Sequence, residues 1–227
     1  MISLAQCMGA DCSHLIYLQQ DHQSFQLHPN AVSAWQMFCA EAAKAGFQPK
    51  IASAHRSLAR QLLIWNEKAT GKRPVLDDDE NPIDINSLTK HELSFAILRW
   101  SALPGLSRHH WGSEIDVYDA SAMSQGYKLQ LTVEETKGSG VFAGFYTWLD
   151  SQFEINQNYC GFSRPYMSVG NGMAKEPWHL SLLEVASQCE ASVDKDKAYE
   201  FIAAQDIKLK DIVLHNFDEI FERFVCS

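Results

Sequence analysis

The chain has 227 residues, of which 46% are hydrophobic and 21% charged, enough apolar material for one domain with a sizeable core or one domain with a small appendage. Its 28 acidic and 19 basic residues give a formal net charge of −9, which argues against nucleic acid or an anionic membrane as a partner. No run of about 18 apolar residues occurs, so no membrane span is expected.

The amino terminus has neither a positively charged segment nor the apolar stretch of an export signal, so the sequence favours the cytoplasm over the periplasm. Six cysteines are scattered along the chain without a C-x-x-C pair. In a chain of this size they are expected to be mostly free thiols, although their spacing leaves a Cys7–Cys12 bridge open.

The first predicted helix covers residues 30–46, where apolar residues recur at helical spacing and a glycine ends the run. Residues 47–54 follow as a short strand, and Ser57 is the expected N-cap of a helix through about Lys68. Residues 69–86 combine glycine, prolines and an acidic run, so they cannot bury much surface. We interpret them as a surface insertion that is either decoration or an active-site lid.

Helical spacing returns over residues 90–103 and stops at Pro104-Gly105. We then expect a strand over residues 111–118, a helix over 141–153, and short extended pieces between the glycines and prolines of 159–182. This order predicts an α+β fold, with a small and mainly antiparallel sheet flanked by helices.

The composition changes after residue 183, where acidic residues outnumber basic ones. The predicted main domain covers residues 1–183, with the motifs in about 30–183, and residues 184–227 are predicted to be a helical extension packed on it. One last amphipathic helix is expected from the apolar positions Leu209, Val213, Phe217, Ile220, Phe221 and Phe224. Four tryptophans within helical patterns are expected in the core: Trp35, Trp65, Trp100 and Trp148.

Three polar segments carry the candidate chemistry. They are Ser53–Ser57 with Gln61, Ser107–Asp116, and Glu176–His179. A catalytic zinc site takes three ligands from His, Asp, Glu or Cys, keeps one position for water, and needs a carboxylate to accept a proton from that water. The segments contain these groups, with candidate ligands His109, Asp116 and His179 and the candidate base Glu176.

The choice between two adjacent histidines stays open from the residues alone. If a strand begins near residue 110, alternation puts His110 on the same face as Asp116 and so favours His110 over His109. If a loop precedes the strand, either histidine is available.

The three segments resemble the signature motifs of the D-alanyl-D-alanine carboxypeptidase family of zinc peptidases, the VanY-like branch that shares a metal core with lysostaphin and hedgehog. The family pattern S-x-H-x-x-G-x-x-x-D falls on Ser107, His109, Gly112 and Asp116, and thereby selects His109. The resemblance implies a metal core built on Zn²⁺.

The family segment E-x-W-H falls on Glu176, Trp178 and His179, which implies a base, a pocket-shaping residue and the third ligand. The segment S-x-x-R-S-x-x-x-Q falls on Ser53, Arg56, Ser57 and Gln61, where the arginine is implied to bind and polarise the substrate. Two departures from the pattern concern the substrate side. His55 replaces a usual tyrosine, and Leu180-Ser181 follows His179 in place of an aromatic residue and an arginine.

These observations predict a zinc metallopeptidase that hydrolyses peptidoglycan stem peptides or D-Ala-D-Ala-type peptides, acting as a carboxypeptidase. Ser107 and Gln61 are candidate partners of the substrate. Two alternatives are an endopeptidase and a non-catalytic, zinc-stabilised binding module, against which a base beside an open metal position argues. No G-x-S-x-G elbow or phosphate-binding loop occurs, so serine and nucleotide chemistry are not expected.

Overall fold

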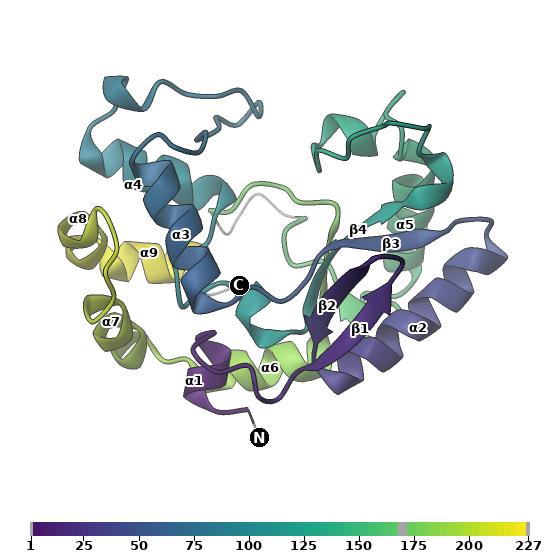
Figure 1. Ribbon diagram of the computed structural model, residues 1–227, viewed down its shortest axis with the longest axis horizontal. Helices are drawn as coiled ribbons and strands as arrows, with labels where there is room; N and C mark the ends of the chain where they lie inside the picture. The colour runs from purple at the N-terminus through teal and green to yellow at the C-terminus, as the bar shows by residue number, and fades with distance from the viewer. Residues whose placement is uncertain (1, 168–171, 226–227) are drawn as a thin grey trace.

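A four-stranded sheet lies at the centre of the fold, with the strand order β3-β4-β6-β5 and antiparallel pairing throughout. The computed structural model describes residues 2–167 and 172–225, arranged as in Figure 1. The small antiparallel sheet and its flanking helices confirm the predicted fold class. Its strands are β3 (Pro49–Ser53), β4 (Glu114–Asp119), β5 (Phe162–Ser163) and β6 (His179–Leu182).

The helices before the last quarter of the chain lie close to their predicted positions, and Ser57 caps α3 by accepting a hydrogen bond from the backbone N–H of Arg60. Helix α4 ends at Trp100, three residues before its predicted end. These helices are α2 (Pro29–Lys44), α3 (Leu58–Ala69), α4 (Lys90–Trp100) and α5 (Ala143–Ile155). A short helix that was not predicted, α1 (Leu4–Cys7), precedes them.

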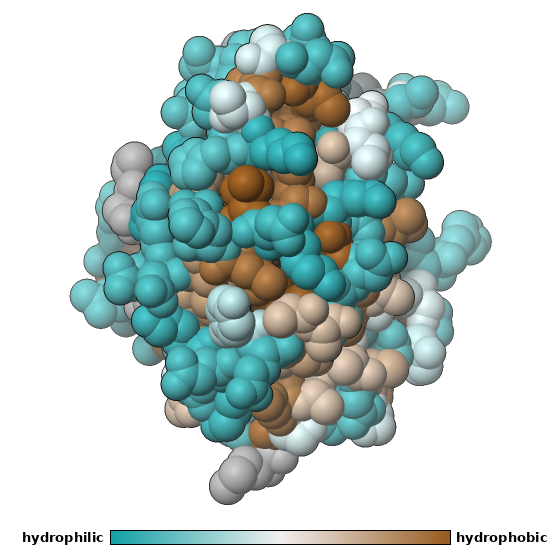
Figure 2. Space-filling view, turned by 90° about the vertical axis from the view of Figure 1, so that its left-hand side faces the viewer, coloured by the Kyte–Doolittle hydropathy of each residue, from teal (hydrophilic) through white to brown (hydrophobic). Residues whose placement is uncertain are grey.

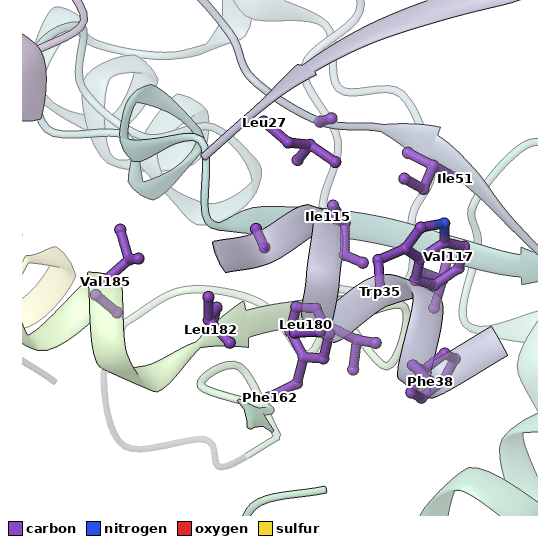
Figure 3. Packing of buried hydrophobic residues seen from close by; sticks show 14 of the residues in the cluster. Leu27, Trp35, Phe38, Ile51, Ile115, Val117, Phe162, Leu180, Leu182 and Val185 are labelled. Carbon is purple, nitrogen blue, oxygen red and sulfur yellow. The ribbon is translucent and has the colours of Figure 1, made fainter. Parts of the chain in front are cut away.

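Strands β4 and β6 have one apolar and one polar face. Figure 3 shows their apolar side chains packing with α2 residues; the buried group includes Ile115, Val117, Leu180, Leu182, Trp35 and Phe38. Because side chains alternate along a strand, the residues between them point to the opposite face. The register pairs Asp116 with His179 and Glu114 with Ser181 on that face. Burial of the apolar face therefore positions a polar surface on the other side.

A two-stranded hairpin, β1 (Ile16–Gln20) and β2 (Gln23–Leu27), precedes α2 and was not anticipated from the sequence. The Gln20 side-chain amide accepts a hydrogen bond from the backbone N–H of Ile51 and donates one to the carbonyl of the same residue, both at 2.9 Å. The amide thus satisfies part of the open edge of β3, which would otherwise expose unpaired backbone groups.

The carboxy-terminal region is helical, and the last helix expected over residues 209–224 is divided into two. Its helices are α6 (Leu183–Ser192), α7 (Lys195–Ala203), α8 (Lys210–His215) and α9 (Phe217–Phe224). Leu209 adopts a left-handed conformation just before α8, and Asn216 separates α8 from α9. The apolar positions therefore do not lie on one continuous helix. Helix α6 packs on the sheet, whereas α7–α9 share a second apolar cluster with α3 and α4. Figure 2 views the side where these helices lie and shows hydrophobic surface framed by hydrophilic side chains.

The acidic insertion forms an ordered loop, with one bridge between Leu76 and Pro82. The Asp77 carboxylate accepts hydrogen bonds from the backbone N–H groups of Asp79 and Asn81, at 2.9 and 2.8 Å. Such side-chain bonds to nearby backbone stabilise tight turns.

Two further sequence expectations concern the cysteines and membrane-spanning helices. The five cysteines within the described ranges are free, and Cys7 makes a side-chain contact with buried Cys189, so the Cys7–Cys12 bridge is not formed. In residues 2–167 and 172–225, none of the helices has the length and apolar character needed to cross a bilayer.

Candidate metal centre

The three candidate ligands lie together at the polar face of the sheet. His109 Nε2 is 3.4 Å from Asp116 Oδ2, and His179 Nδ1 is 3.1 Å from Asp116 Oδ1. One ligand atom from each of the three residues lies within 4.8 Å of the others, and all three side chains are buried. The β4–β6 register accounts for the Asp116–His179 contact, because directly opposed residues have adjacent side chains.

His109 lies in a 3-10 turn, Arg108–Trp111, that precedes β4, so the strand starts later than predicted. Gly112 ends this turn at φ +72°, and a Cβ there would lie 2.3 Å from the Leu15 side chain. Glycine is suited to this position because it adopts positive φ without strain. The alternation argument for His110 therefore does not apply, since that residue is not in extended backbone.

The two adjacent histidines point to different partners. His109 Nδ1 donates to the Ala54 carbonyl at 2.9 Å, which leaves its Nε2 lone pair facing Asp116. Burial lowers the pKa of His109 to about 3, so the ring is neutral. His110 Nδ1 donates to the Arg56 carbonyl, and His110 Nε2 accepts from the Gly105 N–H at 3.1 Å. Both nitrogens of His110 are thus engaged by the backbone.

Glu114 is a site residue that the sequence motifs did not identify. It is fully buried, and its Oε2 lies 2.7 Å from His179 Nε2. Ser113 and Ser181 donate hydrogen bonds to the same carboxylate, and the Arg108 Nε lies 3.6 Å away. Burial favours a raised pKa for Glu114, but Arg108 and His179 hold it at about 2. Its two-residue separation from Asp116 was the available signal.

Contacts at both ring nitrogens define the orientation of His179. Because a carboxylate only accepts hydrogen bonds, His179 Nε2 donates to Glu114, and Nδ1 faces Asp116. Burial would lower the pKa of His179, but its bonds to Asp116 and Glu114 raise it to about 9 in the metal-free state. Each candidate histidine therefore has one nitrogen fixed by a second partner and the other directed at the common point, as is usual for metal ligands.

The chemistry of this donor set fits a zinc ion. Two imidazoles and one carboxylate are among the ligand types of catalytic zinc sites, which leave a further position for water or substrate. The buried carboxylate also carries the negative charge needed, because His109 and His179 overcome the effect of burial and lower the pKa of Asp116 to about 2.

Glu176 lies beside this cluster. Its Oε2 is 3.8 Å from His179 Nδ1, and its side chain is only 15% exposed. Burial raises the pKa of Glu176 to about 7, in contrast to Asp116. Of the two carboxyl groups, the nearby Glu176 is thus the one suited to exchange a proton near neutral pH.

Arg56 is positioned by an unexpected partner. Its guanidinium donates to Gln61 Oε1 at 3.0 Å, and Gln61 Nε2 donates to the Ala102 carbonyl at 2.7 Å. Gln61 is fully buried behind Arg56 and does not line the cavity, so it orients the arginine, whereas a direct substrate contact was expected. The backbone N–H of Arg56 donates to the His109 carbonyl, which ties the arginine to the metal-side turn.

A cavity of about 70 Å³ opens between these groups, room for a few water molecules. Ser107 and Trp178 line it as expected, whereas Ser53 lies outside it, opposite Asp116 in the β3–β4 pairing. The lining also includes residues that the motifs did not select: Trp100, Ser101, Ala102, Arg108, Tyr166 and Met173. Trp100, expected in the core, is half-buried: it packs against the core cluster and also forms a wall of this cavity.

Lys68 is a further buried charge that the sequence did not single out. It is 8% exposed and shares the buried face of α3 with Gln61. Burial lowers its pKa to about 8; the positive charge of Arg73 adds to this effect and Glu176 opposes it. Lys68 therefore lies near enough to Arg56 and Glu176 to interact with both through its charge.

Comparisons with known proteins agree with these features. A family model described as VanY, D-alanyl-D-alanine carboxypeptidase, matches residues 24–185. An uncharacterized protein of Haemophilus influenzae is 44% identical over 96 residues, which are 42% of this chain and 66% of that protein. A second uncharacterized protein of the same organism is 26% identical over 121 residues, or 52% of this chain and 89% of that protein. The match thus spans just under two thirds of the first relative.

Solved structures share the fold at low sequence identity. VanYB in complex with D-alanine-D-alanine is 20% identical, with a TM-score of 0.52 and coverage of 82% of this chain and 88% of that one. The LD-carboxypeptidase LdcB has the same identity and TM-score, covering 88% and 77% of the two chains. A mutant of the vancomycin-resistance D,D-pentapeptidase VanY in complex with Zn(II) gives a TM-score of 0.50 at 20% identity, covering 89% and 92%.

Proposed function

Because the chain belongs to the VanY family of D-alanyl-D-alanine carboxypeptidases, we propose that it is a zinc-dependent carboxypeptidase acting on peptidoglycan stem peptides or D-Ala-D-Ala-type peptides. Family membership supports the coarser statement, a peptidase activity on peptidoglycan-related peptides. The observation that carries the finer proposal is the buried His109–Asp116–His179 cluster, with Glu176 Oε2 3.8 Å from His179 Nδ1.

The three clustered side chains would hold Zn²⁺, which polarises a bound water and a substrate carbonyl when present. His109 fits this role because its neutral ring directs a lone pair inward. His179 fits because Glu114 keeps its Nδ1 directed at the same point. Asp116 supplies the compensating negative charge.

Glu176 would act as the general base. From its position beside the ligands, its carboxylate accepts a proton from the attacking water and then passes that proton to the amine released from the cleaved bond. This role also separates the peptidase proposal from a purely structural zinc module, in which such a base has no use.

Arg56 would bind the anionic part of the substrate. Its guanidinium is held by Gln61 and lines the cavity, where its planar fork suits a carboxylate. The other arginine of the lining, Arg108, is already paired with Glu190 at 2.5 Å and bonded to Ser181. Arg56 is therefore the better candidate for the terminal carboxylate of a peptide.

The test uses zinc-loaded full-length protein and matched stem peptides that end either in a free carboxylate or in an amide. Mass spectrometry should show loss of a terminal residue from the free acid, and cleavage of the amide at least tenfold more slowly, because a buried guanidinium without its anion is unfavourable. Equal rates on both would assign an endopeptidase. Absence of cleavage across the panel, with zinc bound, would favour the binding module.

A further inference from the structure

A second cavity adjoins the one that holds the candidate catalytic groups. Its volume is about 350 Å³, within the range of small-molecule binding pockets. Four separate segments line it: the tip of the insertion, the end of α4, the loop around residues 133–137, and residues 174–175 just before Glu176. The larger space of the cleft therefore lies beside the catalytic groups and not between them.

Trp100 lines both cavities and separates them. Its indole N–H donates to the Asp77 carbonyl at 2.9 Å, so the insertion holds this wall in place. The segment leading to Glu176 also borders both spaces, since Met173 faces the first cavity and Ala174 the second. A peptide with its reacting bond at Glu176 would continue into the second cavity past Trp100.

The insertion is bound on both sides of this second cavity. Asp78 pairs with Arg99 at 2.6 Å, and the same arginine donates to the carbonyl of Met173. Across the cavity, the Glu80 carboxylate accepts a hydrogen bond from the backbone N–H of Val133, at 3.0 and 3.1 Å from its two oxygens. Figure 1 shows the insertion and the segment before α5 standing as two arms at the top of the molecule. The insertion is thus an integral wall of the cleft.

The lining contains acidic and basic side chains that form no ion pair within the described residues. Asp78 and Glu80 are engaged as described, but within the described ranges no ion pair forms at Asp79, Glu134, Lys137 or Lys175. Carboxylates alone would attract a simple cation, and ammonium groups alone a simple anion. Two of each around one cavity are complementary to a group that carries both an ammonium and a carboxylate.

From this arrangement we propose that the second cavity is a substrate subsite for a peptide residue whose side chain ends in both an ammonium and a carboxylate. The inference rests on the proposed peptidase function. Asp79 and Glu134 would receive the ammonium, and Lys137 and Lys175 the carboxylate. Because Arg56 lines only the first cavity, the group bound here is distinct from the terminal carboxylate.

The test uses three pentapeptides that differ only in the third residue. This residue is 2,6-diaminoheptanedioate, whose side chain ends in an ammonium and a carboxylate; lysine, whose side chain ends in the ammonium only; or norleucine, whose side chain has neither. Wild-type protein should show the highest kcat/KM with the first peptide and the lowest with the third. Paired exposed charges contribute modestly, so we expect about fivefold between successive peptides.

Two double variants separate the contributions. Asp79→Asn with Glu134→Gln should remove the advantage of the lysine peptide over the norleucine peptide. Lys137→Met with Lys175→Met should remove the advantage of the first peptide over the lysine peptide. Cleavage of the norleucine peptide should stay within twofold in both. The exposed pair Glu41→Gln with Lys44→Met, on α2 outside the cleft, is the matched control and should change none of the ratios.

Calorimetric binding of the same peptides to zinc-loaded Glu176→Gln protein provides a readout independent of turnover. The same order of affinities without wild-type cleavage would contradict the peptidase function and support the subsite. Cleavage of all three peptides at equal rates would overturn the subsite and leave the peptidase intact. Equal losses on all three peptides, norleucine included, would assign the four charges a structural role and also overturn it.

Discussion

The floor and the rim of the cleft are built in different ways. On the floor, Asp116 and His179 are opposed in a buried antiparallel pair, so backbone hydrogen bonds and the apolar layer beneath determine their separation. At the rim, the insertion meets the 133–137 loop through side-chain bonds to backbone, as between Glu80 and Val133. The difference means that the floor is held by the sheet itself, whereas the rim depends on side-chain contacts between loops. Under the proposed function, the floor would carry the reaction and the rim would contact the rest of the substrate.

The sharpest test of the floor is removal of a ligand. His109→Ala, Asp116→Ala and His179→Ala should each lose bound zinc and nearly all turnover, because a three-ligand site cannot spare a donor. Metal content by mass spectrometry checks this, with circular dichroism as a control for folding.

His110→Ala is the matched variant for this experiment. It should keep its zinc and unfold more easily, by about 1–3 kcal/mol, because two backbone groups lose their partners. A zinc-free His110→Ala protein beside a zinc-loaded His109→Ala protein would contradict the ligand assignment.

Glu176→Gln should keep zinc and the melting temperature but lose turnover by about 10²- to 10⁴-fold, since an amide hydrogen-bonds water but cannot accept its proton. Steady-state kinetics on a free-acid stem peptide measure this loss. The exposed Glu184→Gln variant, in α6, serves as the control. Turnover close to wild type would exclude Glu176 as the base.

Glu114→Gln tests whether the orientation of His179 depends on its buried partner. The amide keeps an acceptor but loses the charge that fixes the Nε2–H, so zinc affinity should fall about 10- to 100-fold. Competition with a chelator measures it. Glu190→Gln removes the other carboxylate bound to Arg108 on its more exposed side and should leave the affinity unchanged. Equal losses would mean that the Arg108 network, and not the contact with His179, is responsible.

The smallest effect is expected from a pH titration of the zinc-free protein, which tests how protonation of His55 and His110 changes its stability. Burial lowers the pKa of His55 to about 4 and that of His110 to about 3, against about 6.5 when unfolded. Their contribution is therefore fully present above pH 6.5 and is lost as the pH falls towards 4 and 3.

For His55 the loss is roughly 1–3 kcal/mol at pH 4, so His55→Phe should flatten the fall in melting temperature between pH 6.5 and 4. His22→Asn, in the exposed β1–β2 turn, is the control. An unchanged slope in His55→Phe would mean that protonation of the half-buried His55 ring does not cause the acid-induced loss of stability.

The positions of α2 and α3 were predictable because apolar periodicity and caps such as Ser57 are local properties. The β1–β2 hairpin was missed because its mostly exposed strands show little alternation of apolar and polar residues. In addition, Gln20 at the end of β1 bonds the backbone of Ile51, a contact between distant segments that the sequence does not reveal. Helices α8 and α9 were predicted as one helix, because the apolar positions continue on both sides of Asn216, where the backbone leaves the helix.

The sequence by itself determined which residue types the proposed zinc site would use, their order along the chain, and most of the helices and strands around them. Only the tertiary structure decided that His109 faces Asp116 while His110 bonds the backbone, that Glu114 supports His179, and that the insertion holds Trp100 between two cavities. Periodicity reports the local backbone, whereas these contacts join residues far apart in the chain. Strand register and the packing of the apolar layer set them, and neither is encoded within a single segment.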